Sequence, residues 1–224
     1  MVGNGKKGKA RVIDLCCGVG TSTRALREAF PDAVTVVGVD TSEQMIAMAH
    51  FLTDHLSFFK PILVEHLKFL KPFVKKVDIK LSTGYTVLNE QRSKFNKAVR
   101  GSFTRGAVTY TRSNAEDTKL PDKSFDLVTV FYAFHEAPQA GRAKILAEAR
   151  RLLDSGGTLA VIDISPEFKP SKSMLSGEPY AIEYQQNIQR QLLTFNGFIR
   201  PEYKVLVPGQ VVMWTMRRAR NAFI

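Results

Sequence analysis

This chain has few residues that could form covalent or metal cross-links. Its 224 residues include two cysteines, Cys16 and Cys17, and four histidines. Adjacent cysteines in a tight turn cannot sensibly pair with each other, so a disulfide framework is excluded. No histidine or further cysteine lies close to them in sequence, which argues against a metal site there. We interpret both cysteines as small residues packed under a ligand rather than as nucleophiles.

Long apolar runs are also missing. No stretch of about 18 apolar residues occurs, so the sequence predicts no membrane span. The start, Met-Val-Gly-Asn-Gly-Lys-Lys, lacks the apolar core of a signal peptide. We expect a cytoplasmic protein, or an organellar one if an upstream transit segment has been removed. A hydrophobic content of 44% over 224 residues is enough for one globular domain with a full core.

Positive charge dominates, with a formal net charge of +11, but it is confined to two segments. Residues 1–13 carry four basic residues and no acid, and residues 51–106 carry eleven basic and four acidic residues. The remainder holds seventeen of each sign. Because the body of the protein is balanced, the composition disfavours a broad nucleic-acid-binding face.

The most informative pattern lies near the N-terminus. An apolar run of strand length ends in Asp14, and the turn that follows contains Gly18 and Gly20. A helix then opens with three hydroxyl residues, and a second apolar run ends in Asp40. This is how an α/β sheet builds a nucleoside site, since backbone packs against the ligand at the turn and an acid accepts hydrogen bonds from the ribose hydroxyls.

Further motifs separate two classes of nucleoside ligand. The dinucleotide fingerprint Gly-x-Gly-x-x-Gly is incomplete when read from Cys16, which disfavours a pyrophosphate. The order of the remaining motifs, Asn114-Ala-Glu-Asp117, 120–126, 127–132, 150–157 and 158–163, together with Asp-Leu-x-Cys-Gly-x-Gly, resembles the class I S-adenosylmethionine (SAM)-dependent methyltransferases. Within that class, the sequence resembles the small-molecule branch related to ubiquinone and menaquinone methyltransferases.

The resemblance implies a Rossmann-like α/β fold in a single domain over 1–224. We expect a seven-stranded sheet with helices on both faces and the last strand antiparallel to the rest. The pattern of apolar residues predicts strands over 11–15, 34–39, 107–110, 126–131, 159–164, 203–207 and 211–216. Helices are predicted from Thr21 or Ser22, from Ser42, over 140–153 and over 180–196. We expect Gly156-Gly157 to end the third helix.

The resemblance also implies SAM as the cofactor and assigns residues to it. Asp14 and the backbone of the following turn should hold the methionine end, and Asp40 should accept the ribose hydroxyls. Asn114 takes the place where relatives often have an aspartate that contacts the adenine. The expected cofactor-binding residues are Asp14, Cys16, Gly18, Gly20, Asp40, Thr41, Met45, Asn114, Ala115, Glu116 and Phe131.

The segment after the fourth strand supplies the candidates for chemistry. His135 and Glu136 follow the carboxyl end of that strand, where loops face the reacting centre. His135 is the best candidate for a base or for a group that orients the acceptor; the alternative is a histidine that caps the next helix. Tyr180 and Tyr184 lie four residues apart, on one helix face, and are candidates for holding an aromatic acceptor or for packing. No metal triad emerges from the sequence.

Residues 51–106 form an insertion relative to the family plan. Apolar residues recur there at steps of three or four between Leu52 and Val77, which predicts helix interrupted at Pro61 and Pro72. Three interpretations stay open: a helical cap packed on the sheet, a basic amphipathic lid for a lipophilic or anionic substrate or a membrane surface, and an RNA contact. Only ten residues precede the first strand, so either another segment closes the site or the natural protein is longer.

The favoured hypothesis is therefore SAM-dependent methyl transfer to a small, lipophilic or aromatic acceptor. The alternatives are an RNA methyltransferase and a non-catalytic SAM-binding partner protein. Against the first alternative, the sequence has no Asn-Pro-Pro-Tyr type loop and no catalytic cysteine motif. The second remains open because the acceptor side has no diagnostic motif.

Overall fold

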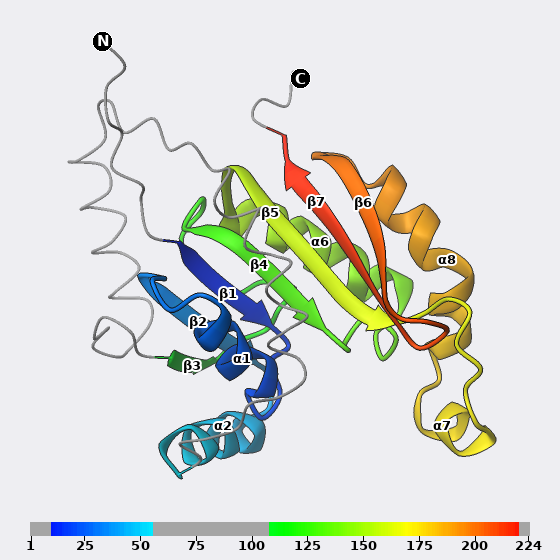
Figure 1. Cartoon of the computed structure of the whole chain (residues 1–224), viewed down its shortest axis with the longest axis horizontal. Coiled ribbons are helices and arrows are strands. Elements are labelled where there is room, and N and C mark those ends of the chain that lie inside the picture. The colour runs from blue at the N-terminus through cyan, green and yellow to red at the C-terminus, as the bar shows by residue number, and fades with distance from the viewer. Residues whose placement is uncertain (1–9, 56–107, 220–224) are drawn as a thin grey trace.

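A computed structural model describes residues 10–55 and 108–219 of the chain. Its centre is a seven-stranded sheet with the order β3-β2-β1-β4-β5-β7-β6 (Figure 1). The strands are β1 (Arg11–Leu15), β2 (Thr35–Asp40), β3 (Val108–Arg112), β4 (Phe125–Phe131), β5 (Leu153–Ile164), β6 (Phe198–Val207) and β7 (Val211–Arg218). The described helices are α1 (Thr21–Ala29), α2 (Glu43–His55), α6 (Gln139–Leu152), α7 (Lys172–Gly177) and α8 (Ala181–Thr194).

The direction of the strands brings the functional loops to one edge of the sheet. The pairs β2–β3, β1–β2, β1–β4 and β4–β5 are parallel, whereas β7 is antiparallel to both β5 and β6. The expected sheet with an antiparallel last strand is confirmed. Because parallel strands end on the same side, the loops after β1, β2, β4 and β5 all lie at one edge of the sheet (Figure 1).

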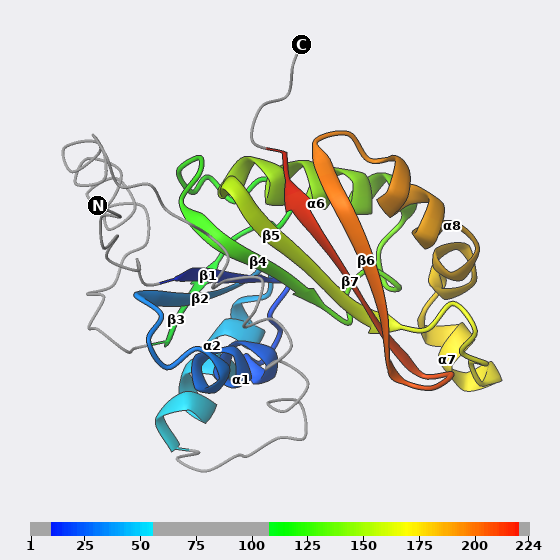
Figure 2. The same cartoon turned by 45° about the horizontal axis from the view of Figure 1, so that its top comes forward.

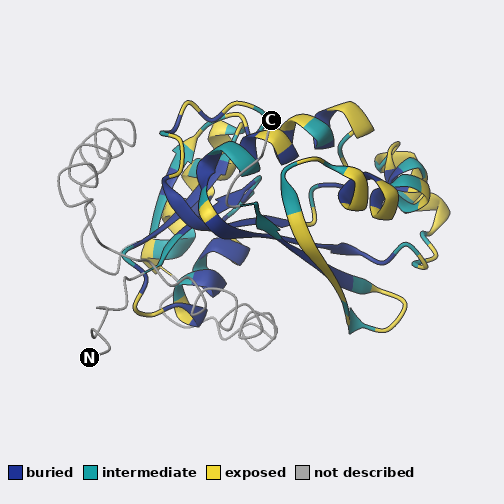
Figure 3. Cartoon of the chain, turned by 90° about the horizontal axis from the view of Figure 1, so that it is seen from above, coloured by how far each residue is buried: buried dark blue, intermediate teal, exposed yellow. Residues whose placement is uncertain are grey.

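Helices cover both faces of the sheet, as expected. Helices α1 and α2 lie on one face and α6 and α8 on the other (Figure 2). Side chains of β1 alternate between the two layers, since Ile13 and Leu15 join the apolar cluster of α6 and α8 while Val12 joins that of α1. Figure 3 shows the central strands as the most buried part of the described chain. A sheet buried on both faces explains the nearly continuous apolar runs in the sequence.

Several local expectations differ from the structure, since β5 begins at Leu153 rather than at 159 and β6 begins at Phe198 rather than at 203. The helix predicted over 140–153 does not run to Gly156-Gly157: α6 ends at Leu152, and the chain is extended from Leu153, with Gly156 at a φ of 77° inside β5. The polar stretch 165–176 leads into the short helix α7, which ends at Gly177 and which the sequence did not predict. The hydroxyl of Ser171 caps α7 by accepting a hydrogen bond from the Met174 amide.

The predicted insertion lies mostly outside the described residues. Residues 51–55 belong to the end of α2, and the structure does not describe 56–107. Among the described residues, no helix is both long and apolar enough to cross a membrane.

Candidate active site

The turn after β1 has the backbone of a ligand cradle. Cys16, Gly18 and Gly20 have φ values of 58°, 52° and 76°, in the left-handed region. A Cβ at Gly20 would lie 2.4 Å from the Tyr110 hydroxyl, so packing against Tyr110 requires glycine there. A Cβ at Gly18 would meet no atom of the described residues within 4 Å. The backbone of Gly18 therefore faces open space, where a ligand can approach.

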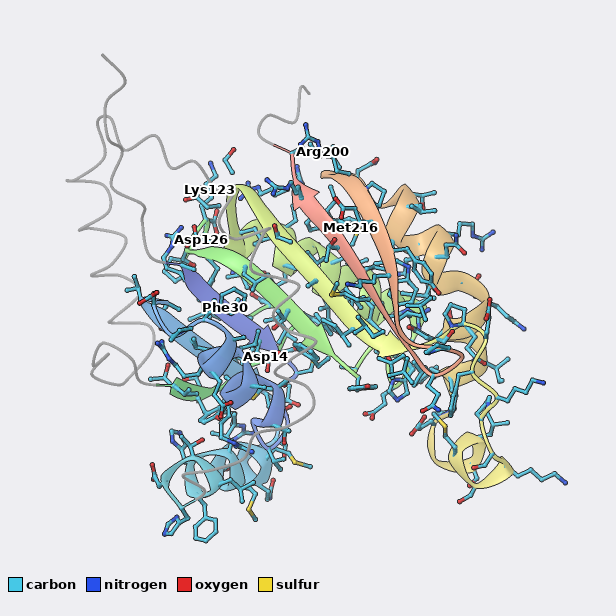
Figure 4. The ribbon with its side chains drawn as sticks, in the orientation of Figure 1. Asp14, Phe30, Lys123, Asp126, Arg200 and Met216 are labelled. Atoms are coloured by element: carbon cyan, nitrogen blue, oxygen red, sulfur yellow. The ribbon has the colours of Figure 1, made fainter. Side chains whose placement is uncertain are left out.

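Asp14 lies beneath this turn, at the carboxyl end of β1 (Figure 4). Its carboxylate is fully buried and accepts hydrogen bonds from the hydroxyls of Ser22 at 2.6 Å, Thr23 at 2.7 Å and Thr129 at 2.8 Å. Burial raises the pKa of Asp14 to about 6, although the three hydroxyls act in the opposite direction. These contacts tie β1, α1 and β4 together, so Asp14 supports the turn from below. A direct contact with the ligand stays a prediction.

Asp40 links the first turn to the second. One of its oxygens accepts the Gly18 amide at 2.9 Å and the other accepts the Ser42 amide at 2.9 Å. The residue is only half-buried, and each carboxylate oxygen can accept more than one hydrogen bond. Asp40 can therefore accept two further hydroxyl donors without giving up its backbone partners.

A third turn lies beside Asp40. The Ser113 amide donates to the Asp40 carbonyl at 2.8 Å, which places the segment 114–117 next to the end of β2. The Asn114 side chain accepts the Glu116 amide at 2.9 Å, so it shapes this turn. Ala115 is buried, while Asn114 is exposed. The position agrees with the predicted adenine turn, and the contact with adenine itself stays a prediction.

The other predicted cofactor residues lie around these turns in different environments. Thr41 is exposed directly after Asp40, and Met45 is 44% exposed on α2, so Met45 is not a core residue. Phe131 is buried at the end of β4 within the apolar cluster that includes α1. Its packing role is thus observed, whereas contact with a cofactor stays a prediction.

Neither cysteine has the environment of a nucleophile. Burial, together with the charges of Asp40 and Asp14, raises the pKa of the Cys16 thiol to about 12. Cys17 is buried and its amide donates to the Val39 carbonyl at 2.9 Å. A thiol held protonated at neutral pH is a poor nucleophile. This supports the interpretation of the pair as packing residues.

His135 lies at the same edge of the sheet, in the loop after β4. Its side chain is 6% exposed, and its Nδ1 lies 2.5 Å from Asp163 at the end of β5. The other oxygen of Asp163 accepts the Phe134 amide at 2.9 Å, so Asp163 fixes both the loop and the ring. A carboxylate at Nδ1 favours the proton on that nitrogen and leaves Nε2 as the acceptor.

Two glutamates converge on the free nitrogen of this ring. Nε2 of His135 lies 3.4 Å from Glu178 and 3.9 Å from Glu136. Burial alone would lower the pKa of His135, but Asp163, Glu178 and Glu136 outweigh it and raise that pKa above its ordinary value. Glu136 and Glu178 also line a cavity of about 640 Å³ beside α7. The histidine therefore sits between the sheet edge and an acidic cavity.

A buried arginine holds the loop that carries His135. Arg142 has no exposed side-chain surface, and its guanidinium donates to the carbonyls of Phe134 at 3.3 Å and Ala137 at 2.6 Å. It also pairs with Glu183 of α8 at 2.8 Å. A charge that is fully buried and fully bonded fixes its partners firmly. Arg142 thus couples α6, α8 and the 134–137 loop.

The two tyrosines predicted near the acceptor have different surroundings. Tyr184 is completely buried, and its hydroxyl donates to the Ile164 carbonyl at 3.0 Å. Tyr180 is 38% exposed at the start of α8. Tyr184 therefore has the packing role that was one of the two alternatives, and contact of either ring with an acceptor stays a prediction.

Sequence reasoning also overlooked residues that the structure places at the site. Asp163 could have been found by the signal that identified Asp40, an acid at the carboxyl end of a parallel strand. Glu178 and Arg142 carried no such signal. Their importance depends on α7 and α8 folding back toward the loop after β4.

Comparison with known proteins agrees with this architecture. Two family models, each described as a methyltransferase domain, match residues 12–100 and 68–161. The ubiquinone/menaquinone biosynthesis C-methyltransferase UbiE of Hydrogenovibrio crunogenus is 34% identical over 102 residues, which cover 44% of this chain and 38% of the relative. The chain thus spans about two fifths of the length of that relative.

Solved structures share the fold over nearly the whole chain. A SAM-dependent methyltransferase from Mesorhizobium loti has 17% identity and a TM-score of 0.56, with 95% of this chain and 92% of that chain covered. Phosphoethanolamine N-methyltransferase 2 of Haemonchus contortus, in complex with SAM, has 15% identity and a TM-score of 0.59, with 96% and 50% covered.

The fold and the turn after β1 thus define the class of protein. The family-model matches, the curated relative and the shared fold together support a class I SAM-dependent methyltransferase. Within that class, its sequence is similar to UbiE.

Proposed function

We propose that this protein transfers a methyl group from SAM to a small, lipophilic or aromatic acceptor. The observation that carries the proposal is the pairing of Gly18 and Asp40: the amide of Gly18 is bonded to Asp40, and the surface above Gly18 is open. A ligand with a ribose and an amino-acid tail fits this arrangement, since the acid can take the hydroxyls while the tail passes over the glycine.

The chemistry requires positioning more than activation. Methyl transfer from a sulfonium is an in-line displacement on a carbon that is already electrophilic, so the protein must hold donor and acceptor in line. In this proposal the turns after β1, β2 and β3 hold the donor. The loop after β4 and the segment 171–179 hold the acceptor.

His135 is the proposed base or orienting group for the acceptor. Asp163 holds Nδ1, which leaves Nε2 to take a proton from an acidic acceptor or to bind its donor. Such help is needed if the acceptor is a phenol, an acid or an activated carbon. Arg142 and Asp163 are positioning residues, because they act through the loop that carries His135.

The acceptor class is supported by the similarity to UbiE. The name of the relative from Hydrogenovibrio crunogenus describes C-methylation in ubiquinone and menaquinone biosynthesis, which involves a lipophilic ring. A basic lid from residues 51–106 would suit such an acceptor or a membrane surface, but 56–106 lie outside the described residues. The neutral body of the protein disfavours RNA.

Methyl transfer from SAM labelled in its methyl group tests the proposal. The intact chain is incubated with pools of phenols, quinols and carboxylates, and the label is followed into small products. We expect transfer to one pool, with loss of turnover in His135→Ala and nearly unchanged SAM affinity. Equal turnover in that variant would remove His135 from the mechanism.

Two other outcomes would replace the proposal. SAM binding without transfer to any pool would favour the non-catalytic partner protein. Label that enters bulk RNA, with RNA binding that falls steeply as salt rises, would favour the RNA methyltransferase.

A further inference from the structure

The strongest unexplained feature of the described chain is the acidic cavity beside His135. The buried Oε2 of Glu178 has no hydrogen-bond partner among the described residues, and it lies 3.4 Å from Nε2 of His135, the nitrogen that Asp163 leaves without a proton. Among the described residues, the ion pairs of Glu136 and Glu178 involve His135, and neither glutamate pairs with a lysine or an arginine. A buried carboxylate oxygen without a donor or cation is costly, so a positive ligand would stabilise this arrangement.

The donor atoms already have the spacing of a cation site. Nε2 of His135 and one carboxylate oxygen from each of Glu136 and Glu178 lie within 4.8 Å of one another. Two ligands bound at about 2.1 Å to a tetrahedral ion lie about 3.4 Å apart. The distance from Nε2 to Glu178 is 3.4 Å. Glu136 is 3.9 Å away and its side chain is 64% exposed, so a small rotation brings it into range.

The surroundings of His135 match those of a metal-binding histidine. The ring is nine-tenths buried, and Asp163 accepts at Nδ1, which aims the lone pair of Nε2 at the two glutamates. Histidine ligands of metals usually donate their second nitrogen to a carboxylate in this way. The Asp163 contact is independent of the two glutamates, because Asp163 comes from the end of β5 and is fully buried.

We propose that His135, Glu136 and Glu178 form a binding site for a divalent transition-metal ion at the side of the cavity that the two glutamates line. A site of one imidazole and two carboxylates suits Mn²⁺, Fe²⁺ or Zn²⁺ better than it suits Mg²⁺ or Ca²⁺, which prefer sites made only of oxygen ligands. Three protein ligands leave coordination positions open toward the cavity, where an oxygen of a bound molecule can join. With an ion bound at Nε2, His135 cannot take a proton, so the base role proposed above applies to the metal-free protein.

Mn²⁺ is the best probe because it prefers nitrogen and oxygen ligands. A softer ion could bind instead to the sulfur atoms of Cys16 and Cys17. The chelator-treated full chain is titrated with MnCl₂ and followed by electron paramagnetic resonance and calorimetry, without SAM or acceptor. We expect one bound Mn²⁺ per chain. Glu178→Gln and His135→Asn should each weaken binding at least tenfold, and Asp163→Asn should weaken it by about 10- to 100-fold.

The matched control is Glu202→Gln, at an exposed position on β6. It removes the same charge and should leave Mn²⁺ affinity unchanged. Melting curves of each variant without metal distinguish the loss of a ligand atom from the loss of folding. If Glu178→Gln does not fold, Glu178→Asp is tested instead, and we expect it to keep part of the Mn²⁺ affinity. No binding at millimolar Mn²⁺, or binding that Glu178→Gln and His135→Asn leave intact, would overturn the proposal. Because no methyl transfer is measured, this result is independent of the proposed reaction.

Discussion

At this site, the role of an individual residue depends on the hydrogen-bond partners that surround it. Asp14 and Asp163 both end a parallel strand and both are fully buried, yet they do different work. Asp14 accepts three hydroxyls and supports a turn, whereas Asp163 fixes an imidazole. The sequence identified the acid of the first strand from its glycine turn, whereas Asp163 has no such turn and could have been found only as an acid at the end of a strand.

The raised pKa of Asp14 makes the stability of the fold depend on pH. The carboxyl has a pKa of about 6 in the folded protein and about 3.9 when unfolded. The folded state therefore binds more protons between these values, and the free energy of unfolding falls as pH rises from about 4 to about 6, by roughly 3 kcal/mol from this group. We expect Asp14→Asn to flatten that part of the profile, measured by urea denaturation. An unchanged slope, equal to that of the exposed control Asp32→Asn, would contradict this assignment.

The pKa of His135 sets the acidic limb of the activity profile in the proposed reaction. A base must be unprotonated, so kcat/KM should rise with pH through a value above the ordinary 6.5 for histidine. Asp163→Asn removes the strongest partner that raises this pKa, so we expect the limb to move to lower pH and kcat to fall. Rate profiles in chelated buffer measure both. A limb at the same pH in Asp163→Asn would show that another group titrates.

At the scale of elements, a local sequence pattern predicted the structure correctly where that pattern alone determines the conformation. The strand over 11–15 was predicted with its observed bounds, because five residues of an apolar run end at a glycine turn. The glycine pair at 156–157 was misread, since pairing of β5 with β4 extends the chain before the glycines are reached. Helix α7 lies in a polar stretch without periodicity, and its Ser171 cap is visible only in the structure.

The turn between β1 and α1 permits a matched test of its role. Gly18 and Gly209 both have positive φ values, 52° and 66°, and a Cβ on either would meet no atom of the described residues within 4 Å. Alanine at each position should destabilise the fold by about 1–2 kcal/mol, the cost of a left-handed conformation. Only Gly18→Ala should also weaken SAM binding, by at least tenfold, because its methyl group would enter the cradle.

Denaturation curves and calorimetry of the two glycine variants provide the comparison. Gly209 lies in the hairpin between β6 and β7, away from the turn after β1 (Figure 1). Equal SAM affinity in Gly18→Ala and Gly209→Ala would mean that the ligand does not pass over Gly18.

At the scale of the whole molecule, the sheet brings motifs that are far apart in the sequence together in one site. The turns after β1, β2 and β3 meet because their strands are parallel neighbours, and this much followed from the sequence. The acceptor side did not follow, because it depends on how α6, α7 and α8 pack. Buried Arg142 is the clearest case, since its four partners come from two separate segments, the loop after β4 and α8.

Binding of SAM should stabilise the whole chain. A ligand that binds only the folded state at 100 times its dissociation constant contributes about 2.7 kcal/mol. For a domain of this size that corresponds to a rise in Tm of roughly 5–11 °C. Thermal unfolding with and without SAM measures it, and adenosine diphosphate serves as a control nucleotide. An equal shift with the control would contradict the preference for SAM over a pyrophosphate.

The most direct measurement is a calorimetric titration of SAM into the unaltered chain and into Asp40→Ala. The Asp40 carboxylate, which accepts hydrogen bonds from the Gly18 and Ser42 amides, is the group proposed to accept hydrogen bonds from the ribose hydroxyls of SAM. We predict binding of one SAM per unaltered chain, weakened by about 1–3 kcal/mol in the variant, with the exposed control Asp32→Ala unaffected. Absence of binding, or the same affinity in Asp40→Ala, would contradict the account.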